Sequence, residues 1–186
     1  DPSYSAYWGN VTQLDAGFGR LMKEVGRLNL NDNLFTLFTS DNGPARTGFH
    51  PHGETGGLSA RKGWLTEGGI RVPGILQWSG KTRPGSTSEV PVSGVDLLPT
   101  LCEIAGIEKP TDRTIDGSSF LPLLKGKPMQ RHKPLYWHFY AASGKHKVAM
   151  RTGDWKILAH LNAPEMSRLV DLTTLDQKAL KTAKLG

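Results

Sequence analysis

The sequence has only one cysteine, no long apolar run and no block of like charge among its 186 residues. A single cysteine excludes an intramolecular disulfide. Cys102 lies in the apolar pattern of Val95 to Ala105, where a small buried side chain is expected. A membrane-spanning helix needs roughly 20 apolar residues, so we predict no membrane span. The sequence also lacks a signal peptide and begins at Asp1 without methionine, so we interpret it as part of a longer protein.

The basic residues are dispersed, although the net charge is +6 and the pI is about 9.5. Basic proteins can bind nucleic acids or concentrate anionic substrates in a cleft. Because the sequence has no run of five like charges and no recognisable nucleic-acid-binding module, we expect no nucleic-acid partner. A non-catalytic module that binds sulfated polysaccharide or another polyanion stays open as an alternative.

Turn-forming residues are abundant, with 22 glycines and 12 prolines, and they favour a mixed α/β fold rich in loops. Apolar residues three and four positions apart predict an amphipathic helix from Tyr4 to Leu28. The apolar runs from Leu34 to Thr39 and from Val72 to Trp78 predict strands, the first of them buried. The glycine-rich residues 43–69 between them predict a long loop, which in a compact domain is typically functional.

Two helices are predicted after the second strand. The first runs from Leu97 to Ala105, with Asp96 as its N-cap and Gly106 as its stop signal. The second is shorter and covers residues 118–124.

The last third of the chain predicts a small antiparallel-sheet subdomain over residues 131–186, separate from an α/β region over residues 1–130. Short β-favouring runs predict strands at 135–140, 147–151 and 155–159, with a tight turn between the last two. Beyond residue 160 the pattern is weaker, and we expect a helix over residues 176–185.

Asp41 and Asn42 follow the first predicted strand directly, at the carboxyl end where open α/β sheets place their ligand sites. A carboxylate beside a side-chain carbonyl suits a hard cation such as Ca²⁺ or Mg²⁺. An ordinary Asp-Asn-Gly turn is the alternative. Since Ca²⁺ takes about six to eight oxygen ligands, a metal site here would need further ligands from outside these 186 residues.

Three cations, Arg61, Lys62 and Arg71, bracket a glycine-rich turn that leads into the second predicted strand. Cations on a glycine-flanked loop suit an oxyanion such as sulfate or phosphate, and a solvated basic loop is the alternative. The sequence contains neither a Walker A pattern nor a dinucleotide-binding fingerprint. His52, between the two motifs, is expected to be an exposed loop residue.

Several motifs, in order along the chain, carry a family resemblance. They are Thr39-Ser40-Asp41-Asn42-Gly43-Pro44, Arg61-Lys62-Gly63, Glu67-Gly68-Gly69-Ile70-Arg71-Val72-Pro73 and Gly94-Val95-Asp96-Leu97-Leu98-Pro99-Thr100-Leu101. With these motifs the chain resembles the second half of a type I sulfatase, of the kind that includes arylsulfatase A and N-acetylgalactosamine-6-sulfatase. The resemblance covers most of residues 4–160.

The resemblance implies an alkaline-phosphatase-like α/β sandwich with a small C-terminal antiparallel sheet. It implies that the full-length protein hydrolyses an aryl or carbohydrate sulfate ester, with Ca²⁺ bound in part by Asp41 and Asn42. Lys62 matches the family's lysine that contacts the sulfate group and assists the leaving oxygen, as a charge stabiliser and candidate general acid. The resemblance also implies a secreted, periplasmic or lysosomal location.

The family's nucleophile is a formylglycine made from Cys or Ser within a Cys/Ser-x-Pro-x-Arg motif. Cys102 precedes Glu-Ile-Ala and does not match that motif. We therefore expect the formylglycine upstream of this chain and expect the chain alone to be inactive. A phosphatase or phosphonate hydrolase of the same superfamily, with a Thr or Ser nucleophile, is an alternative, although the surroundings of Lys62 favour the sulfatase.

Overall fold

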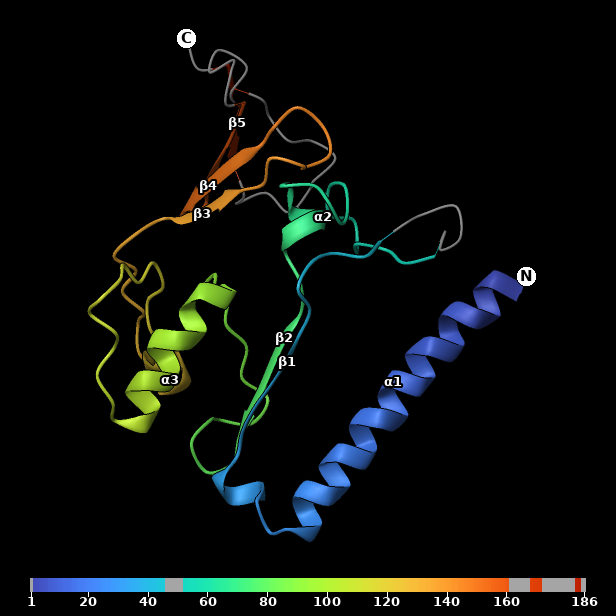
Figure 1. Ribbon diagram of the computed structural model, residues 1–186, viewed down its shortest axis with the longest axis vertical. Helices are drawn as coiled ribbons and strands as arrows, with labels where there is room; N and C mark the ends of the chain where they lie inside the picture. Colours follow the sequence, from blue (N-terminus) through green and yellow to red (C-terminus); the bar gives the residue numbers. More distant parts are fainter. Residues whose placement is uncertain (1, 46–51, 161–167, 172–182, 185–186) are drawn as a thin grey trace.

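The computed structural model describes residues 2–45, 52–160, 168–171 and 183–184, which form a mixed α/β structure with two separate antiparallel sheets (Figure 1). The first part contains helix α1 (Pro2–Arg27), a 3-10 turn (Asn31–Asn33), β1 (Phe35–Thr39), α2 (Glu67–Ile70) and β2 (Gly74–Trp78). A second 3-10 turn (Gly94–Asp96), α3 (Leu97–Ala105) and α4 (Leu121–Leu124) follow. The last part contains β3 (Leu135–His138), β4 (Val148–Thr152), β5 (Trp155–Ala159), β6 (Arg168–Asp171) and β7 (Ala183–Lys184).

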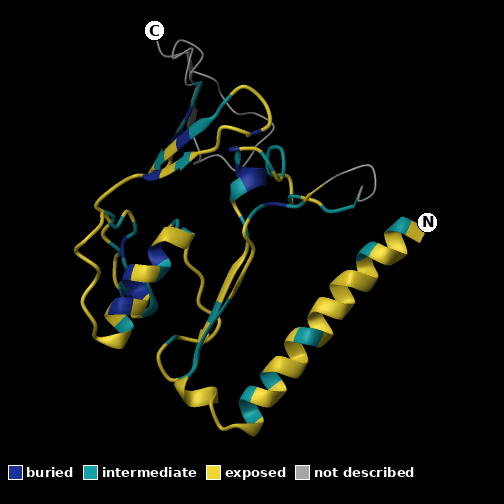
Figure 2. Ribbon diagram, in the orientation of Figure 1, coloured by how far each residue is buried: buried dark blue, intermediate teal, exposed yellow. Residues whose placement is uncertain are grey.

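Helix α1 confirms the predicted N-terminal helix, but within the described residues it buries no side chain. Its apolar stripe is exposed, including Trp8, Leu14 and Leu21 (Figure 2). One edge-on ring contact, between Phe18 and Phe38 at 5.6 Å, connects α1 to strand β1. Among the helices that the structure describes, none combines the length and apolar character needed to cross a membrane.

Strands β1 and β2 pair as an antiparallel ribbon, in register from Phe35 opposite Trp78 to Thr39 opposite Gly74. Both strands were predicted, but the expected burial of the first is wrong for this structure. β1 is half-buried at its start and exposed at Phe38 and Thr39. The physical reason is that a two-stranded ribbon has few neighbours, and no second layer of described residues covers it.

The five strands β3 to β7 form one antiparallel sheet in sequence order, as the predicted C-terminal sheet requires. Strands β4 and β5 make the predicted hairpin, closed by the pair Thr152 and Trp155. The predicted helix over residues 176–185 is wrong at its end, because Ala183 and Lys184 form β7. Residues 172–182 lie outside the described part, and the predicted domain boundary at residue 130 stays a prediction.

The main core joins this sheet to the glycine-rich segment before β2. Leu65 is buried together with Ala142, Ala149 and Leu158 of the C-terminal region. Ile70 and Trp137 pack against the same cluster. The end of the predicted long loop therefore contains a one-turn helix, α2 (Glu67–Ile70), and from Leu65 onward it packs as part of the core.

Helix α3 spans the predicted residues and ends at Gly106, whose φ of +67° is the left-handed conformation that favours glycine. Asp96 is the N-cap residue of α3, as predicted, but its side chain makes no capping hydrogen bond to that helix. The buried Asp96 carboxylate instead accepts hydrogen bonds from the backbone amides of Ser93 at 2.8 Å and Ser118 at 2.9 Å. Both terminal nitrogens of Arg131 bind the same carboxylate, at 2.9 and 2.6 Å.

Thr100, also fully buried, completes this connection. Its hydroxyl donates to the Asp96 carbonyl at 2.6 Å and accepts from the Phe120 amide at 3.0 Å. In the segment predicted as a second helix, residues 118–124, the backbone amides of Ser118 and Phe120 therefore bind the buried side chains of Asp96 and Thr100. Only Leu121–Leu124 is helical.

Candidate functional site

The Asp41–Asn42 turn leaves strand β1 and lies beside the beginning of β2. The Thr39 hydroxyl donates to the Pro73 carbonyl at 2.9 Å, and the Ser40 hydroxyl donates to the Asn42 carbonyl at 3.0 Å. These bonds fix the turn locally. They leave the Asp41 side chain exposed and Asn42 half-buried.

The turn docks onto the α2 segment through backbone groups. The Gly43 amide donates to the Gly69 carbonyl at 2.9 Å. A Cβ atom on Gly43 would lie 1.8 Å from the Gly68 carbonyl oxygen, so the approach requires glycine at position 43. The Lys62 amide donates to the Pro44 carbonyl at 3.2 Å. These contacts bring the two predicted motifs together, although they are about twenty residues apart in the sequence.

Asn42 and Lys62 line one cavity of about 460 Å³. The Lys62 side chain is exposed at its edge, and no described carboxylate lies within ion-pair distance of its ammonium. Asp41 adjoins this cavity through the turn but is not among the described residues that line it. Of the three predicted anion-binding cations, Lys62 alone faces the cavity within the described chain. Arg71 instead lies 3.8 Å from Glu89.

The opposite wall of the cavity comes from strand β3 and the residue after it, some seventy residues further along the chain. Tyr136, Trp137, His138 and Phe139 line it there, and Trp64 lines it beside Lys62. Strand β3 was predicted from the sequence, but its position on the cavity wall was not. No local pattern shows which remote strand a loop will face, so only the packing of the sheet onto the loop reveals it.

The donor set at the turn suits part of a hard-cation site. The Asp41 carboxylate and the Asn42 side-chain carbonyl supply adjacent oxygen donors on one exposed turn. A closed Ca²⁺ site needs about six to eight oxygens, and within the described residues no group of three or more His, Cys, Asp or Glu could hold a metal ion. The two residues therefore fit as a partial ligand set.

A buried ion cluster joins α2 to the C-terminal sheet. Lys156 of β5 contacts Glu67 of α2, with 2.7 Å between Nζ and Oε1. Arg151 of β4 approaches the other carboxylate oxygen, with 3.7 Å between Nη1 and Oε2. Burial lowers the pKa of Lys156, and the attraction of Glu67 opposes that shift. Glu67 begins one of the motifs that carry the family resemblance, but the sequence assigned a role to neither Glu67 nor Lys156.

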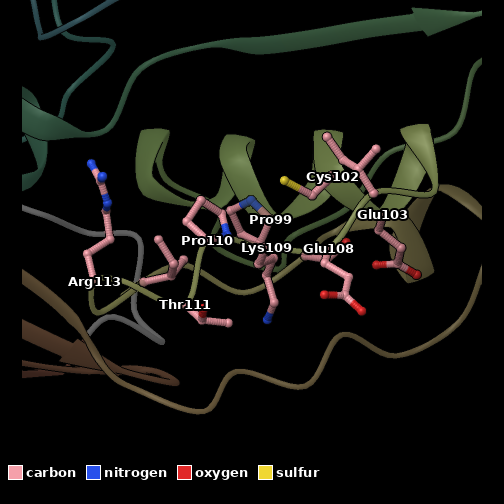
Figure 3. A pocket seen from close by; sticks show the side chains of 11 residues that line it. Pro99, Cys102, Glu103, Glu108, Lys109, Pro110, Thr111 and Arg113 are labelled. Atoms are coloured by element: carbon pink, nitrogen blue, oxygen red, sulfur yellow. The ribbon is translucent and has the colours of Figure 1, made fainter.

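A second cavity, of about 600 Å³, lies between α3 and the loop that follows it (Figure 3). Cys102 is buried beside it, as expected for a small apolar side chain. The carboxylates of Glu103 and Glu108 lie at one end and the Arg113 guanidinium at the other, where it pairs with Asp112 at 2.6 Å. Because the charged groups do not converge, this cavity has no arrangement suited to catalysis.

His52 is half-buried, which corrects the prediction of an exposed loop residue. Its ring packs edge-on against Tyr4 at 5.0 Å and is tilted against Tyr7 at 5.9 Å. Its Nε2 lies 3.0 Å from the Ser3 hydroxyl. His52 therefore joins the start of α1 to the loop, and it is not among the described residues that line the cavity beside Lys62.

Comparison with known proteins connects this geometry to a family. The family model described as N-sulphoglucosamine sulphohydrolase, C-terminal, matches residues 53–183. Rat steryl-sulfatase (Rattus norvegicus) is 36% identical over 141 residues, which cover 73% of this chain and 24% of that protein. The chain belongs to the sulfatase family. Human arylsulfatase A (Homo sapiens) is 37% identical to this sulfatase chain over 148 residues, covering 79% of the chain and 29% of that protein.

The fold agrees with the same assignment. The structure of BT4656 in complex with its substrate D-glucosamine-2-N,6-O-disulfate is similar to this sulfatase chain with a TM-score of 0.66 and 28% identity. The match covers 87% of this chain and 32% of that one. The chain therefore has the C-terminal α/β architecture of the alkaline-phosphatase-like sulfatases, with the small antiparallel sheet that the resemblance implied. It spans between a quarter and a third of the length of these relatives.

Proposed function

We propose that the protein containing this chain hydrolyses sulfate esters and that Asp41, Asn42 and Lys62 form part of its sulfate site. The observation that carries the proposal is the cavity shared by Asn42 and Lys62. The backbone bonds from Gly43 to Gly69 and from Lys62 to Pro44 bring the two motifs together there. A cation and an amide side chain beside a cavity are suited to binding the oxygens of an anion.

Lys62 is proposed to stabilise charge on the departing oxygen. When the sulfur–oxygen bond of the ester breaks, negative charge develops on the leaving alkoxide or phenoxide. An ammonium group beside that oxygen stabilises the charge most when water is scarce, and it can also donate a proton. The Lys62 side chain lines the cavity, and no described carboxylate is paired with its ammonium, so the charge is available to a bound anion.

Asp41 and Asn42 are proposed to hold a Ca²⁺ ion together with ligands from outside this chain. When bound, the ion would supply positive charge that polarises the sulfate oxygens. The residues' own part is to present two oxygen donors on a turn whose backbone is fixed by Ser40 and Gly43. We also propose that the nucleophile, a formylglycine, lies outside this chain and that the chain alone has no turnover, since Cys102 is buried beside a different cavity.

The substrate is proposed to be an aryl or carbohydrate sulfate. Trp64, Tyr136 and Phe139 give the cavity an aromatic wall beside Lys62, and aromatic rings pack well against both phenyl and sugar rings. The names of the relatives include both kinds, an arylsulfatase and a protein whose substrate is a sulfated glucosamine. A secreted, periplasmic or lysosomal location is the corresponding expectation for the whole protein.

A binding experiment tests the site without requiring turnover. The chain is labelled with ¹⁵N and titrated with 4-nitrophenyl sulfate, with and without CaCl₂, while the backbone amides are followed by NMR. We expect shifts at Asn42, Lys62 and Trp64. Because this chain supplies only part of the Ca²⁺ ligand set, CaCl₂ should tighten the binding only slightly. The variant Lys62→Met should lose the response. Lys81→Met, which removes an exposed lysine from the loop after β2, should retain it.

Other outcomes of the titration favour the alternative functions. Equal affinity of Lys62→Met and Lys81→Met for a sulfated polysaccharide, lost at high salt and independent of Ca²⁺, would favour a non-catalytic polyanion-binding module. Clear preference for 4-nitrophenyl phosphate over the sulfate would favour a phosphatase or phosphonate hydrolase. Either result would contradict the sulfatase proposal.

A further inference from the structure

We infer that Glu67 and Lys156 are positioning residues. Their buried ion pair connects the C-terminal sheet to the loop that carries Lys62 and keeps Lys62 in its place beside the cavity. The significance of that place for catalysis rests on the proposed function of Lys62. The mechanical inference itself concerns only contacts within this chain. Neither residue lines the cavity among the described residues, so neither is proposed to touch substrate.

The segment that carries Lys62 has little regular structure of its own. From residue 57 to the start of α2 it consists of turns and bends, and α2 itself has only four residues. A one-turn helix of this kind is not stable by itself. Its position must therefore come from contacts with other elements.

Glu67 supplies such a contact from the first residue of α2. Its carboxylate is bound by Lys156 at 2.7 Å and approached by Arg151 at 3.7 Å, so a cation faces each oxygen. The Glu67 and Lys156 side chains are 6% and 1% exposed, which excludes most of the water that would weaken the pair. These two residues are 89 positions apart, and the pair connects the loop directly to the middle of the sheet.

The surroundings of Lys156 indicate that net stabilisation alone is a poor explanation for the pair. Its ammonium lies 5.6 Å from the centre of the Trp137 ring, which packs against the apolar core, and Glu67 and Arg151 are the charged side chains near it. Transferring two charges from water into such a region costs several kcal/mol per ion, and an apolar pair is often as stable. An ion pair specifies one geometry, however, because a displaced partner leaves a charge buried alone.

The position of Glu67 is transmitted to both motifs through the backbone. The next residue, Gly68, donates its amide to the Ser59 carbonyl at 2.8 Å. Gly69 accepts the hydrogen bond from Gly43 in the Asp41–Asn42 turn, at 2.9 Å. A Cβ at Gly68 or Gly69 would lie 2.2 or 2.1 Å from a carbonyl oxygen of the Lys62 loop, so α2 cannot shift without moving both motifs.

The C-terminal region also contacts the residue after Lys62. The Ser143 amide, in the connection between β3 and β4, donates to the Gly63 carbonyl at 2.6 Å. Gly144 lies so close to the Trp64 ring that a Cβ there would be 2.5 Å from it. Contacts from the C-terminal region therefore hold the Lys62 loop on both sides, with the Glu67–Lys156 pair at the buried end.

Hydrogen exchange of single amides, measured by NMR in increasing urea, tests the inference. The double variant Glu67→Met/Lys156→Met removes both buried partners together. The Arg151 guanidinium loses its approach to Glu67 but is partly exposed and keeps the hydrogen bond from Nε to the Gly153 carbonyl at 3.0 Å, so we expect the variant to fold. The amides of Lys62 and Gly43 should exchange at least tenfold faster than in the wild type. Their exchange should occur through an opening insensitive to urea, which is the signature of local rather than global unfolding. The amides paired between β4 and β5 should follow the global free energy of unfolding.

Two control variants separate positioning from general destabilisation. Asp96→Asn weakens the other buried ion pair and should accelerate exchange only in step with global stability. Asp116→Asn/Lys133→Met removes an exposed pair of similar length, 2.8 Å, and should change neither amide. The inference is overturned if the Lys62 and Gly43 amides of the double variant remain as protected as its β4–β5 amides.

If the double variant does not fold, Lys156→Met provides the same test, because Glu67 then still has Arg151 facing its carboxylate. Faster local exchange at Lys62 supports the inference, and unchanged local exchange overturns it. Titration with 4-nitrophenyl sulfate then separates the two proposals. Local loosening in a chain whose wild type binds no anion would sustain the positioning role while refuting the proposed function.

Discussion

Helix α1 and the C-terminal sheet have opposite surroundings within the described chain (Figure 2). The 26 residues of α1 include no buried side chain, and much of its apolar stripe is exposed. The sheet buries Ala149 and Leu158 against Leu65 of the loop and contains a fully buried lysine. Local sequence pattern is thus sufficient to specify α1, whereas the geometry of the site depends on contacts between segments remote in sequence. We therefore expect substitutions at the contacts between remote segments to lower the free energy of unfolding more than substitutions in α1.

The largest effect is expected from Asp96→Ala. It leaves the Arg131 guanidinium and the buried Ser118 amide without their shared acceptor. Breaking a buried pair in this way costs about 3–5 kcal/mol of unfolding free energy, measurable by urea denaturation. Asp116→Ala, which breaks an exposed pair with Lys133, should cost no more than about 1 kcal/mol. Similar losses in the two variants would show that the Asp96 connection does not stabilise the fold.

The next effect compares the two regions directly. Leu65→Ala should lower the free energy of unfolding by about 3 kcal/mol, because it opens a cavity in the shared core. Leu14→Ala, on the exposed stripe of α1, should change it by less than about 0.5 kcal/mol. Urea denaturation of both variants provides the measurement. A large loss in Leu14→Ala would mean that α1 is packed in solution, for example against a second molecule.

A smaller effect is expected from Gly43→Ala. Its Cβ would overlap the Gly68 carbonyl oxygen, so the turn must move away from α2 at a cost of about 1–3 kcal/mol. The amide resonances of Asn42 and Lys62 should shift together in NMR spectra. Gly74→Ala adds a Cβ with no heavy atom within 4 Å and should leave those resonances in place. Unchanged Asn42 and Lys62 resonances in Gly43→Ala would show that the docking of the turn is looser than the structure indicates.

The smallest effect concerns the pH dependence of stability. Burial lowers the pKa of Lys156 in the folded chain, so between that value and the ordinary lysine pKa of 10.5 the unfolded chain binds more protons. The free energy of unfolding should therefore rise with pH across this window through Lys156, by at most about 1.4 kcal/mol per pH unit for one proton. The Lys156→Met variant lacks this contribution. Urea denaturation at several alkaline pH values should show a steeper rise in the wild type, and parallel curves would count against the lowered pKa.

The elements predictable from the sequence are those specified by neighbours in the chain. Helices α1 and α3 follow from apolar spacing, and Gly106 ends α3 because its positive φ suits glycine. The strands from β1 to β5 were predicted within a few residues of their observed ends. One-turn helix α2 was missed because four residues within a glycine-rich stretch carry no periodic signal.

The site could be predicted only in part, for a related reason. The resemblance indicated Asp41, Asn42 and Lys62, and the structure brings Asn42 and Lys62 to one cavity. The cavity wall from β3 and the roles of Asp96 and Glu67 depend on partners between 22 and 89 positions away. One usable signal was present. Lys156 shares a face of its strand with Leu158, and an ionisable residue among inward-facing positions requires a buried partner.

The Glu67–Lys156 pair has a consequence for protein engineering. Asp41, Asn42 and Lys62 all lie within the first 62 residues, so a graft of that portion onto another scaffold would carry all three. Such a graft would still omit β5, the strand that anchors their loop. A transplantable unit must therefore extend through β5. A unit that ended at the turn at Gly153 would lack Lys156, the partner of Glu67, although Asp41, Asn42 and Lys62 would all be present.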